Sequence, residues 1–166
     1  MDPQSVTYTP IGIIHSPFKD PVGMPIQPSG ARGIRGTVEI FPPYREGLRD
    51  LEGFSHVILL YHFHRSPPGR LIVRPYLDIV DRGVFATRAP ARPNPIGIST
   101  VRLLGIREGI LTVEDVDILD GTPLLDVKPY VPAFDAYCDA TAGWLGGTEE
   151  SVRRARSDER FHRESS

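Results

Sequence analysis

Short apolar runs recur along the chain, and turn-forming residues separate them. The runs are rich in Val, Ile, Leu, Phe and Tyr, while Gly, Pro, Asp and Asn stand between them. Branched and aromatic residues favour strands, and the intervening residues favour turns. The pattern predicts strands at 8–15, 36–41, 54–64, 72–77, 83–87, 97–106, 110–119 and 122–130.

Helical patterns are confined to two places, 45–51 and the tail that begins at Thr148. Gly109 ends the segment Arg107-Glu108-Gly109, and a second glycine follows Asp120, so both segments are expected to form hairpin turns. Many short strands with few helices predict an all-β fold, a closed or nearly closed β-barrel. Residues 1–147 are expected to form this barrel domain, and residues 148–166 a tail with a helical pattern.

A second feature is a pair of unusual loops. Residues 20–35 show little regular pattern, and loops of this length in compact domains are usually functional or mobile. Further on, Arg92-Pro93-Asn94-Pro95 forms a stiff corner, because proline fixes φ and pushes the preceding residue toward extended geometry. A rigid loop that carries arginine and asparagine at a strand end is more often a ligand site than a connector.

Charge is unevenly distributed along the chain. The formal net charge is only −2, yet residues 65–92 hold six arginines against two aspartates, and residues 108–139 hold eight acids against one lysine. The first stretch suits RNA phosphates, and the second suits a cationic cofactor, although both are also typical of ordinary solvated faces. Cys138 is the lone cysteine, more typical of a small buried side chain than of a nucleophile, which fits a cytoplasmic setting. No run of 18 apolar residues predicts a membrane span.

Four ordered motifs resemble those of a known family. They are Ile11-Gly12-Ile13-Ile14-His15-Ser16-Pro17-Phe18, Leu51-Glu52-Gly53-Phe54-Ser55-His56, Gly83-Val84-Phe85-Ala86-Thr87-Arg88 with Arg92-Pro93-Asn94-Pro95-Ile96-Gly97, and Asp120-Gly121-Thr122-Pro123-Leu124-Leu125-Asp126-Val127-Lys128-Pro129-Tyr130. Together they resemble the TsaA-like (YaeB-like) β-barrel family. Its characterised bacterial members are S-adenosylmethionine-dependent methyltransferases that modify N6-threonylcarbamoyladenosine next to the tRNA anticodon.

The resemblance implies a barrel fold, S-adenosylmethionine as cofactor, tRNA as partner, a cytoplasmic enzyme and a homodimer. The longer bacterial members continue into an additional C-terminal domain, whereas this chain ends at Ser166. The chain also lacks a Gly-x-Gly-x-x-Gly motif after a strand, so a doubly wound methyltransferase is not expected.

The resemblance also assigns residues to roles. The positions that it matches to cofactor contacts are Gln27, Pro28, Ser29, Gly30, His64, Arg65, Arg88, Ile98, Asp120, Gly121, Thr122 and Pro123. The residues expected at the substrate are Arg92, Asn94, Lys128 and Tyr130. Because the acceptor nitrogen must lose a proton, a base is expected, and Asp126, Tyr130 or a histidine could serve. Asp120 could instead be a turn residue.

Two other functions compete with this interpretation. His56, His62 and His64 share parity on one predicted strand, which resembles the metal site of cupin-type oxygenases. The simplest interpretation of His56 is a hydrogen-bonded residue of the barrel interior. The second alternative is a barrel that binds RNA without catalysis. A methyltransferase with another acceptor is also compatible with the sequence, and no metal site is predicted under the family interpretation.

Overall fold

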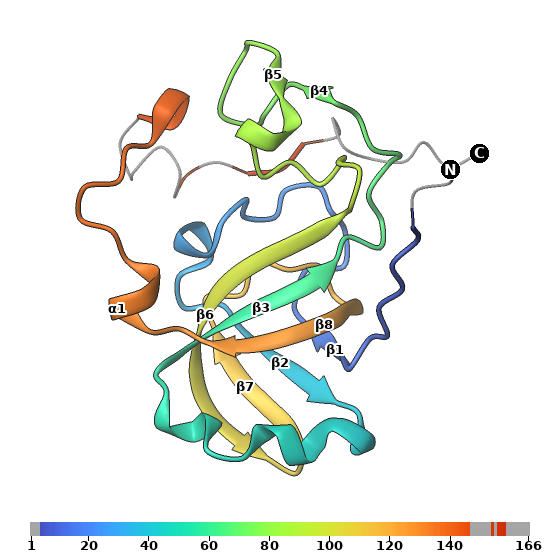
Figure 1. Ribbon diagram of the computed structural model, residues 1–166, viewed down its shortest axis with the longest axis vertical. Coiled ribbons are helices and arrows are strands. Elements are labelled where there is room, and N and C mark those ends of the chain that lie inside the picture. The colour runs from blue at the N-terminus through green and yellow to red at the C-terminus, as the bar shows by residue number, and fades with distance from the viewer. Residues whose placement is uncertain (1–3, 147–153, 155, 159–166) are drawn as a thin grey trace.

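The computed structural model describes residues 4–146, 154 and 156–158, and its main feature is a closed antiparallel barrel (Figure 1). The barrel strands are β1 (Gly12–His15), β2 (Arg35–Ile40), β3 (His56–His62), β6 (Ile96–Arg107), β7 (Ile110–Glu114) and β8 (Thr122–Pro129). Their order around the barrel is β1-β2-β7-β6-β3-β8, and β8 closes the barrel on β1. The predicted all-β barrel is therefore confirmed.

The remaining elements are short. Two residues each form β4 (Ile72–Val73) and β5 (Arg82–Gly83), which pair with one another and lie beyond one end of the barrel (Figure 1). The helical elements are η1 (Pro28–Ala31), η2 (Pro42–Leu48), η3 (Leu51–Gly53), η4 (Val84–Ala86), α1 (Pro132–Asp135) and η5 (Gly143–Leu145). None of the helices among the described residues is both long and apolar enough to span a bilayer.

The core follows from alternation along the strands. On β3, Val57, Leu59 and Tyr61 are buried and point inward, whereas the residues between them face outward. Inward residues of the other barrel strands complete one cluster, which includes Ile14, Val38, Val101, Leu111, Val113 and Leu124. A second, smaller cluster consists of Val73, Val84, Ala89 and Ala91. The segment 71–86, which contains β4, β5 and η4 and is called the β4–β5 lobe below, contributes Val73 and Val84 to it.

Long strand β6 links two neighbours and turns tightly at its end. Its first part pairs with β3 and its last part with β7, with a register shift between Leu103 and Gly105. Glu108 and Gly109 form the predicted hairpin turn, and both have positive φ, of 52° and 83°. Such a pair matches the right-handed twist of the flanking strands.

Several predicted strands are shorter or absent. The strand expected at 83–87 is wrong, because Val84–Ala86 is a 3-10 turn in which Thr87 N–H donates to the Val84 carbonyl at 3.1 Å. Burial of Val84 against the small cluster explains this turn better than strand propensity does. The strand expected at 72–77 ends at Val73, and that expected at 110–119 ends at Glu114.

Other expectations also need correction. The helical segment at 45–51 is two 3-10 helices, separated at Asp50, whose φ is +67°. The turn at Asp120-Gly121 exists, but it is not a hairpin, because β8 pairs with β1 and β3 and not with β7. Cys138 is exposed and not buried. The helical tail expected from Thr148 lies largely outside the described residues, and within it Arg156 pairs with Pro25.

Candidate functional site: a cavity beyond the end of the barrel

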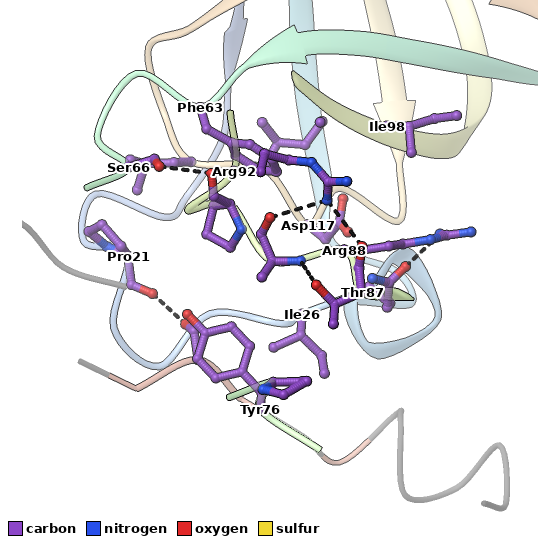
Figure 2. Close-up of a pocket in the computed structure, with 18 of the residues that line it drawn as sticks. Pro21, Ile26, Phe63, Ser66, Tyr76, Thr87, Arg88, Arg92, Ile98 and Asp117 are labelled. Carbon is purple, nitrogen blue, oxygen red and sulfur yellow. Dashed lines mark hydrogen bonds between the residues drawn. The ribbon is translucent and has the colours of Figure 1, made fainter. Parts of the chain in front are cut away.

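A large cavity lies between the barrel end, the loop that follows Lys19 and the rigid corner before β6 (Figure 2). Its volume is about 770 Å³, which is in the range of small-molecule sites. Apolar side chains form much of the wall, among them Ile26, Phe63, Tyr76 and Ile98. The cavity therefore offers flat apolar surface with a few polar groups, as a nucleoside-containing ligand requires.

Eight of the predicted site residues meet in this cavity, although they come from five separate segments. They are Gln27, His64, Arg65, Arg88, Arg92, Asn94, Ile98 and Thr122. Six of them were expected at the cofactor and two, Arg92 and Asn94, at the substrate. Convergence of residues as far apart as Gln27 and Thr122 is a property of the fold and not of the sequence order.

The two arginines of the signature have different surroundings. Arg88 donates from Nη1 to the Gln27 side-chain oxygen at 3.0 Å, which joins the rigid corner to the first loop. Arg92 donates from Nη1 to the carbonyls of Thr87 and Ala89, at 3.1 and 3.3 Å (Figure 2). Arg92 thus fixes the shape of its own loop, whereas the exposed Arg88 side chain connects two loops at the cavity.

His64 lies just past the end of β3 and carries no charge at neutral pH. Burial lowers the pKa of its imidazole, and Arg65 and His62 add to this effect. The Thr122 hydroxyl donates to the Leu119 carbonyl at 2.6 Å and lies 3.4 Å from His64 Nδ1.

Five of the predicted cofactor residues are described and lie outside the lining of the cavity. Ser29 and Gly30 belong to η1, Asp120 and Gly121 precede β8, and Pro123 lies in β8. Asp120 accepts the Ser16 N–H at 2.9 Å and pairs with the Lys19 ammonium at 2.5 Å. The Lys19 hydrogen bond is the main reason that the pKa of Asp120 is lowered. The turn role of Asp120 accounts for these contacts.

Two of the expected bases, Asp126 and Tyr130, are not part of the described cavity lining, whereas a histidine, His64, is. Asp126 is paired with Lys128 at 2.8 Å and accepts the Val127 N–H at 2.9 Å. Tyr130 packs edge-on against His56, with the ring centroids 6.2 Å apart. Asp126, Lys128, Tyr130 and His56 are therefore not among the described residues that line the cavity.

The histidine-based metal hypothesis finds no support in the geometry. His56 and His62 both lie on the outward face of β3, whereas His64 lies beyond the strand and lines the cavity. The interior position expected for His56 is wrong, because its inward neighbour Val57 takes that place and His56 Nδ1 bonds the Ser55 hydroxyl at 2.8 Å. No three His, Cys, Asp or Glu side chains of the described residues are grouped to hold a metal ion.

Sequence reasoning missed three polar residues of the inner wall. Asp117 and Tyr61 line the cavity, and the buried Ser99 is hydrogen-bonded to both. The missed signal was an acid inside a segment of apolar residues, Val116 to Ile118, since acids are rarely buried without a purpose. Two further lining residues, Trp144 and Ser157, come from the part of the chain where no family motif was found.

Comparison with known proteins identifies the family. Residues 13–136 match the family model of the tRNA-methyltransferase O N-terminal domain. The chain belongs to this family.

Its relatives include proteins of several lengths. A "probable S-adenosyl-L-methionine-binding protein" of Pyrococcus abyssi is 58% identical over 96% of this chain and 86% of its own length. The tRNA (adenine(37)-N6)-methyltransferase of Escherichia coli is 38% identical over 84% of this chain, which spans 64% of that protein. Among solved structures, TrmO from Pseudomonas aeruginosa superposes with a TM-score of 0.75 at 45% identity, covering 87% of this chain and 64% of that one.

Proposed function

We propose that this protein is an S-adenosylmethionine-dependent methyltransferase that methylates N6 of threonylcarbamoyladenosine next to the tRNA anticodon. Membership of the tRNA-methyltransferase O family and the names of its relatives in Pyrococcus abyssi and Escherichia coli support this activity. The chain spans 64% of the Escherichia coli enzyme. The tRNA substrate of that enzyme is therefore proposed for this chain, and the comparison does not by itself establish it.

The observation that carries the proposal is that separate segments, which the resemblance matches to cofactor contacts, converge on one cavity. The first loop contributes Gln27, the end of β3 His64, the signature Arg88, β6 Ile98 and β8 Thr122. An ordinary surface cleft gives no reason for these five segments to meet. Residues of the same motifs that lie outside the lining, such as Asp120, hold the loops in place.

The chemistry of the lining fits the cofactor. Ile98 and Phe63 offer apolar surface to an adenine ring, and Arg88 offers a guanidinium to the carboxylate of the methionine part. When bound, S-adenosylmethionine supplies an electrophilic methyl group, and the protein contributes mainly by orienting donor and acceptor.

The remaining parts of the proposal concern assembly and location. A homodimer and a cytoplasmic location are both proposed from the family resemblance. Large exposed apolar side chains on the β4–β5 lobe, Leu71, Ile72, Ile79 and Phe85, are consistent with a covered surface there. Sedimentation analysis of the purified protein tests the dimer.

The first test is calorimetric titration with S-adenosylmethionine. We expect binding by the wild type and an affinity at least about tenfold weaker for Arg88→Ala, because a hydrogen bond to a charged group is worth about 1.5–3 kcal/mol. Arg107→Ala is the matched control, since Arg107 is exposed at the opposite end of β6. Methyl transfer to tRNA that carries threonylcarbamoyladenosine then tests the acceptor. Absence of both heat and thermal stabilisation at millimolar cofactor would contradict the proposal.

A further inference from the structure

A carboxyl group that no predicted role uses lies in the inner wall of the cavity. Asp117 is 9% exposed and lines the cavity, and its Oδ1 accepts the Ser99 hydroxyl at 2.6 Å. Ser99 is itself 2% exposed, on the inward face of β6. Burial of a carboxyl costs free energy unless the surroundings compensate the charge, so such a group calls for a function.

The hydrogen bonds behind Asp117 have one direction. Tyr61 Oη lies 3.0 Å from Ser99 Oγ. Because the single Ser99 proton is donated to Asp117, Tyr61 must donate to Ser99. Burial raises the pKa of the Tyr61 phenol far above its ordinary value, with the Asp117 charge as a second cause, so Tyr61 keeps its proton. In the chain Tyr61–Ser99–Asp117 each hydroxyl therefore donates toward Asp117 Oδ1. The other carboxyl oxygen, Oδ2, takes no part in this chain.

The surroundings of Asp117 bring the pKa of its carboxyl close to neutral pH, so both protonation states are populated there. Burial raises the pKa of its carboxyl to about 7, while the Ser99 hydrogen bond and the positive charge of Arg88 act in the opposite direction. None of the ion pairs among the described residues includes Asp117, so Arg88 acts on it from a distance. His64, Arg65 and Arg92 line the same cavity, and the first of them is neutral.

We infer that Asp117 is the proton acceptor of the methyl transfer, a role that rests on the proposed function. The acceptor nitrogen uses its lone pair to form the new bond to the methyl carbon, and the electrons of the carbon–sulfur bond go to sulfur. The N–H proton passes to Asp117, and the electrons of that bond stay on nitrogen. The positive charge of the sulfonium and the negative charge of Asp117 are both lost in this step.

This assignment replaces Asp126 and Tyr130, two of the bases expected from the sequence. Asp126 is held by Lys128 outside the described lining, and Tyr130 packs on His56. A base must come within hydrogen-bond reach of the proton that it takes. Asp117 is the aspartate that combines a place in the described lining with a carboxyl free of an ion pair.

The test uses the full-length chain and the variant Asp117→Asn. Carbon NMR of the cofactor-free wild type should show one aspartate carboxyl that titrates near pH 7, and this signal should be lost in the variant. Asp117→Asn should bind S-adenosylmethionine within about threefold of the wild type in calorimetry, because Asn keeps the size of the side chain. Its single-turnover rate on tRNA bearing threonylcarbamoyladenosine should fall at least about 100-fold, the lower range of general-base effects. The wild-type rate should rise with pH and level off above the carboxyl transition.

Two further variants keep the test decisive. Ser99→Ala removes the donor to Oδ1 and should move both the NMR titration and the pH–rate profile to higher pH, even where Asp117→Asn folds poorly. Glu46→Gln, an exposed change on η2, should leave both unchanged. A variant Asp117→Asn that keeps its rate within tenfold overturns the role, and so does a loss confined to cofactor affinity. A wild type that binds no cofactor overturns the proposed function itself.

Discussion

The ring of Tyr61 lies against Gly97 and occupies the space that a β-carbon on Gly97 would need. The two residues are direct partners across β3 and β6, and a Cβ built on Gly97 would overlap the Tyr61 ring atoms. The ring in turn packs edge-on against Phe63, with centroids 5.5 Å apart. The glycine of the signature is therefore required by packing, and Tyr61 is held so that its hydroxyl reaches Ser99.

We expect Gly97→Ala to displace the Tyr61 ring. Overpacking of this kind typically lowers the free energy of unfolding by about 1–3 kcal/mol. The cavity lining should also move, so S-adenosylmethionine should bind more weakly. Chemical denaturation and calorimetry measure the two effects.

The same strand provides a control for this substitution. Gly105 also lies on β6, but a Cβ there would meet nothing within 4 Å. Gly105→Ala should therefore change stability by less than about 0.5 kcal/mol, as surface substitutions usually do. If Gly97→Ala and Gly105→Ala lower the free energy of unfolding equally, the cause is the loss of glycine from the strand backbone and not a clash with the Tyr61 ring.

The buried carboxyl of Asp117 should make stability depend on pH. Its pKa is raised from 3.8 to about 7 in the folded protein. Between these values the native state holds a proton that the unfolded state has released, so the free energy of unfolding falls as pH rises from about 4 to about 7 and then levels off. At 1.36 kcal/mol per pKa unit the Asp117 contribution is at most about 4 kcal/mol.

Asp117→Asn removes this contribution. The variant should be more stable than the wild type at pH 8, by about 1–3 kcal/mol, and the difference should shrink toward pH 4. Urea denaturation at several pH values measures this. A variant that is less stable at pH 8 would show that the wild-type carboxylate is well compensated, contrary to the burial argument.

Ser157 should hold the first loop against the cavity. Its hydroxyl accepts the Met24 N–H at 3.1 Å and bonds the Pro21 carbonyl, while its backbone carbonyl accepts the Gly23 N–H at 2.8 Å. Ser157→Ala removes the first two contacts and keeps the third. In hydrogen exchange we expect faster exchange at Met24, smaller change at Gly23, and several-fold weaker cofactor binding because Pro21 and Met24 line the cavity. Unchanged Met24 exchange would contradict this role.

Asp120 should contribute stability through its contacts with Ser16 and Lys19, in the segment that follows β1. Removing the Ser16 and Lys19 bonds by Asp120→Ala should cost about 1–2 kcal/mol at pH 7. Because the folded pKa of Asp120 is lowered, the part due to its charge is present above the unfolded pKa of 3.8 and is lost as pH falls through the folded value. Thermal unfolding at pH 7 and pH 2.5 measures this, with the exposed change Asp139→Ala as control. If Asp120→Ala lowers stability by the same amount at pH 2.5 as at pH 7, the charge of Asp120 makes no contribution to stability.

The sequence predicted the barrel well where alternation is strong. On β3 and β6 alternate burial matches the alternate apolar pattern, and the Glu108-Gly109 turn follows from local backbone preference. It failed at 83–87, where apolar residues read as a strand. There, Val84 is buried in a cluster with Val73 and Ala91, and this non-local packing selects a 3-10 turn.

The site divides in the same way. The family motifs, the stiff corner around Pro93 and the residue types available for a cofactor can all be read from the sequence, because they depend on local chemistry. Which of the candidate residues share a cavity depends on the tertiary structure. It brings Gln27, Arg88 and Thr122 together, excludes Asp126 and Tyr130 from the described lining, and adds Asp117. The physical reason is that barrel closure sets distances between strands far apart in sequence, and burial alone gives a carboxyl like Asp117 its proton affinity.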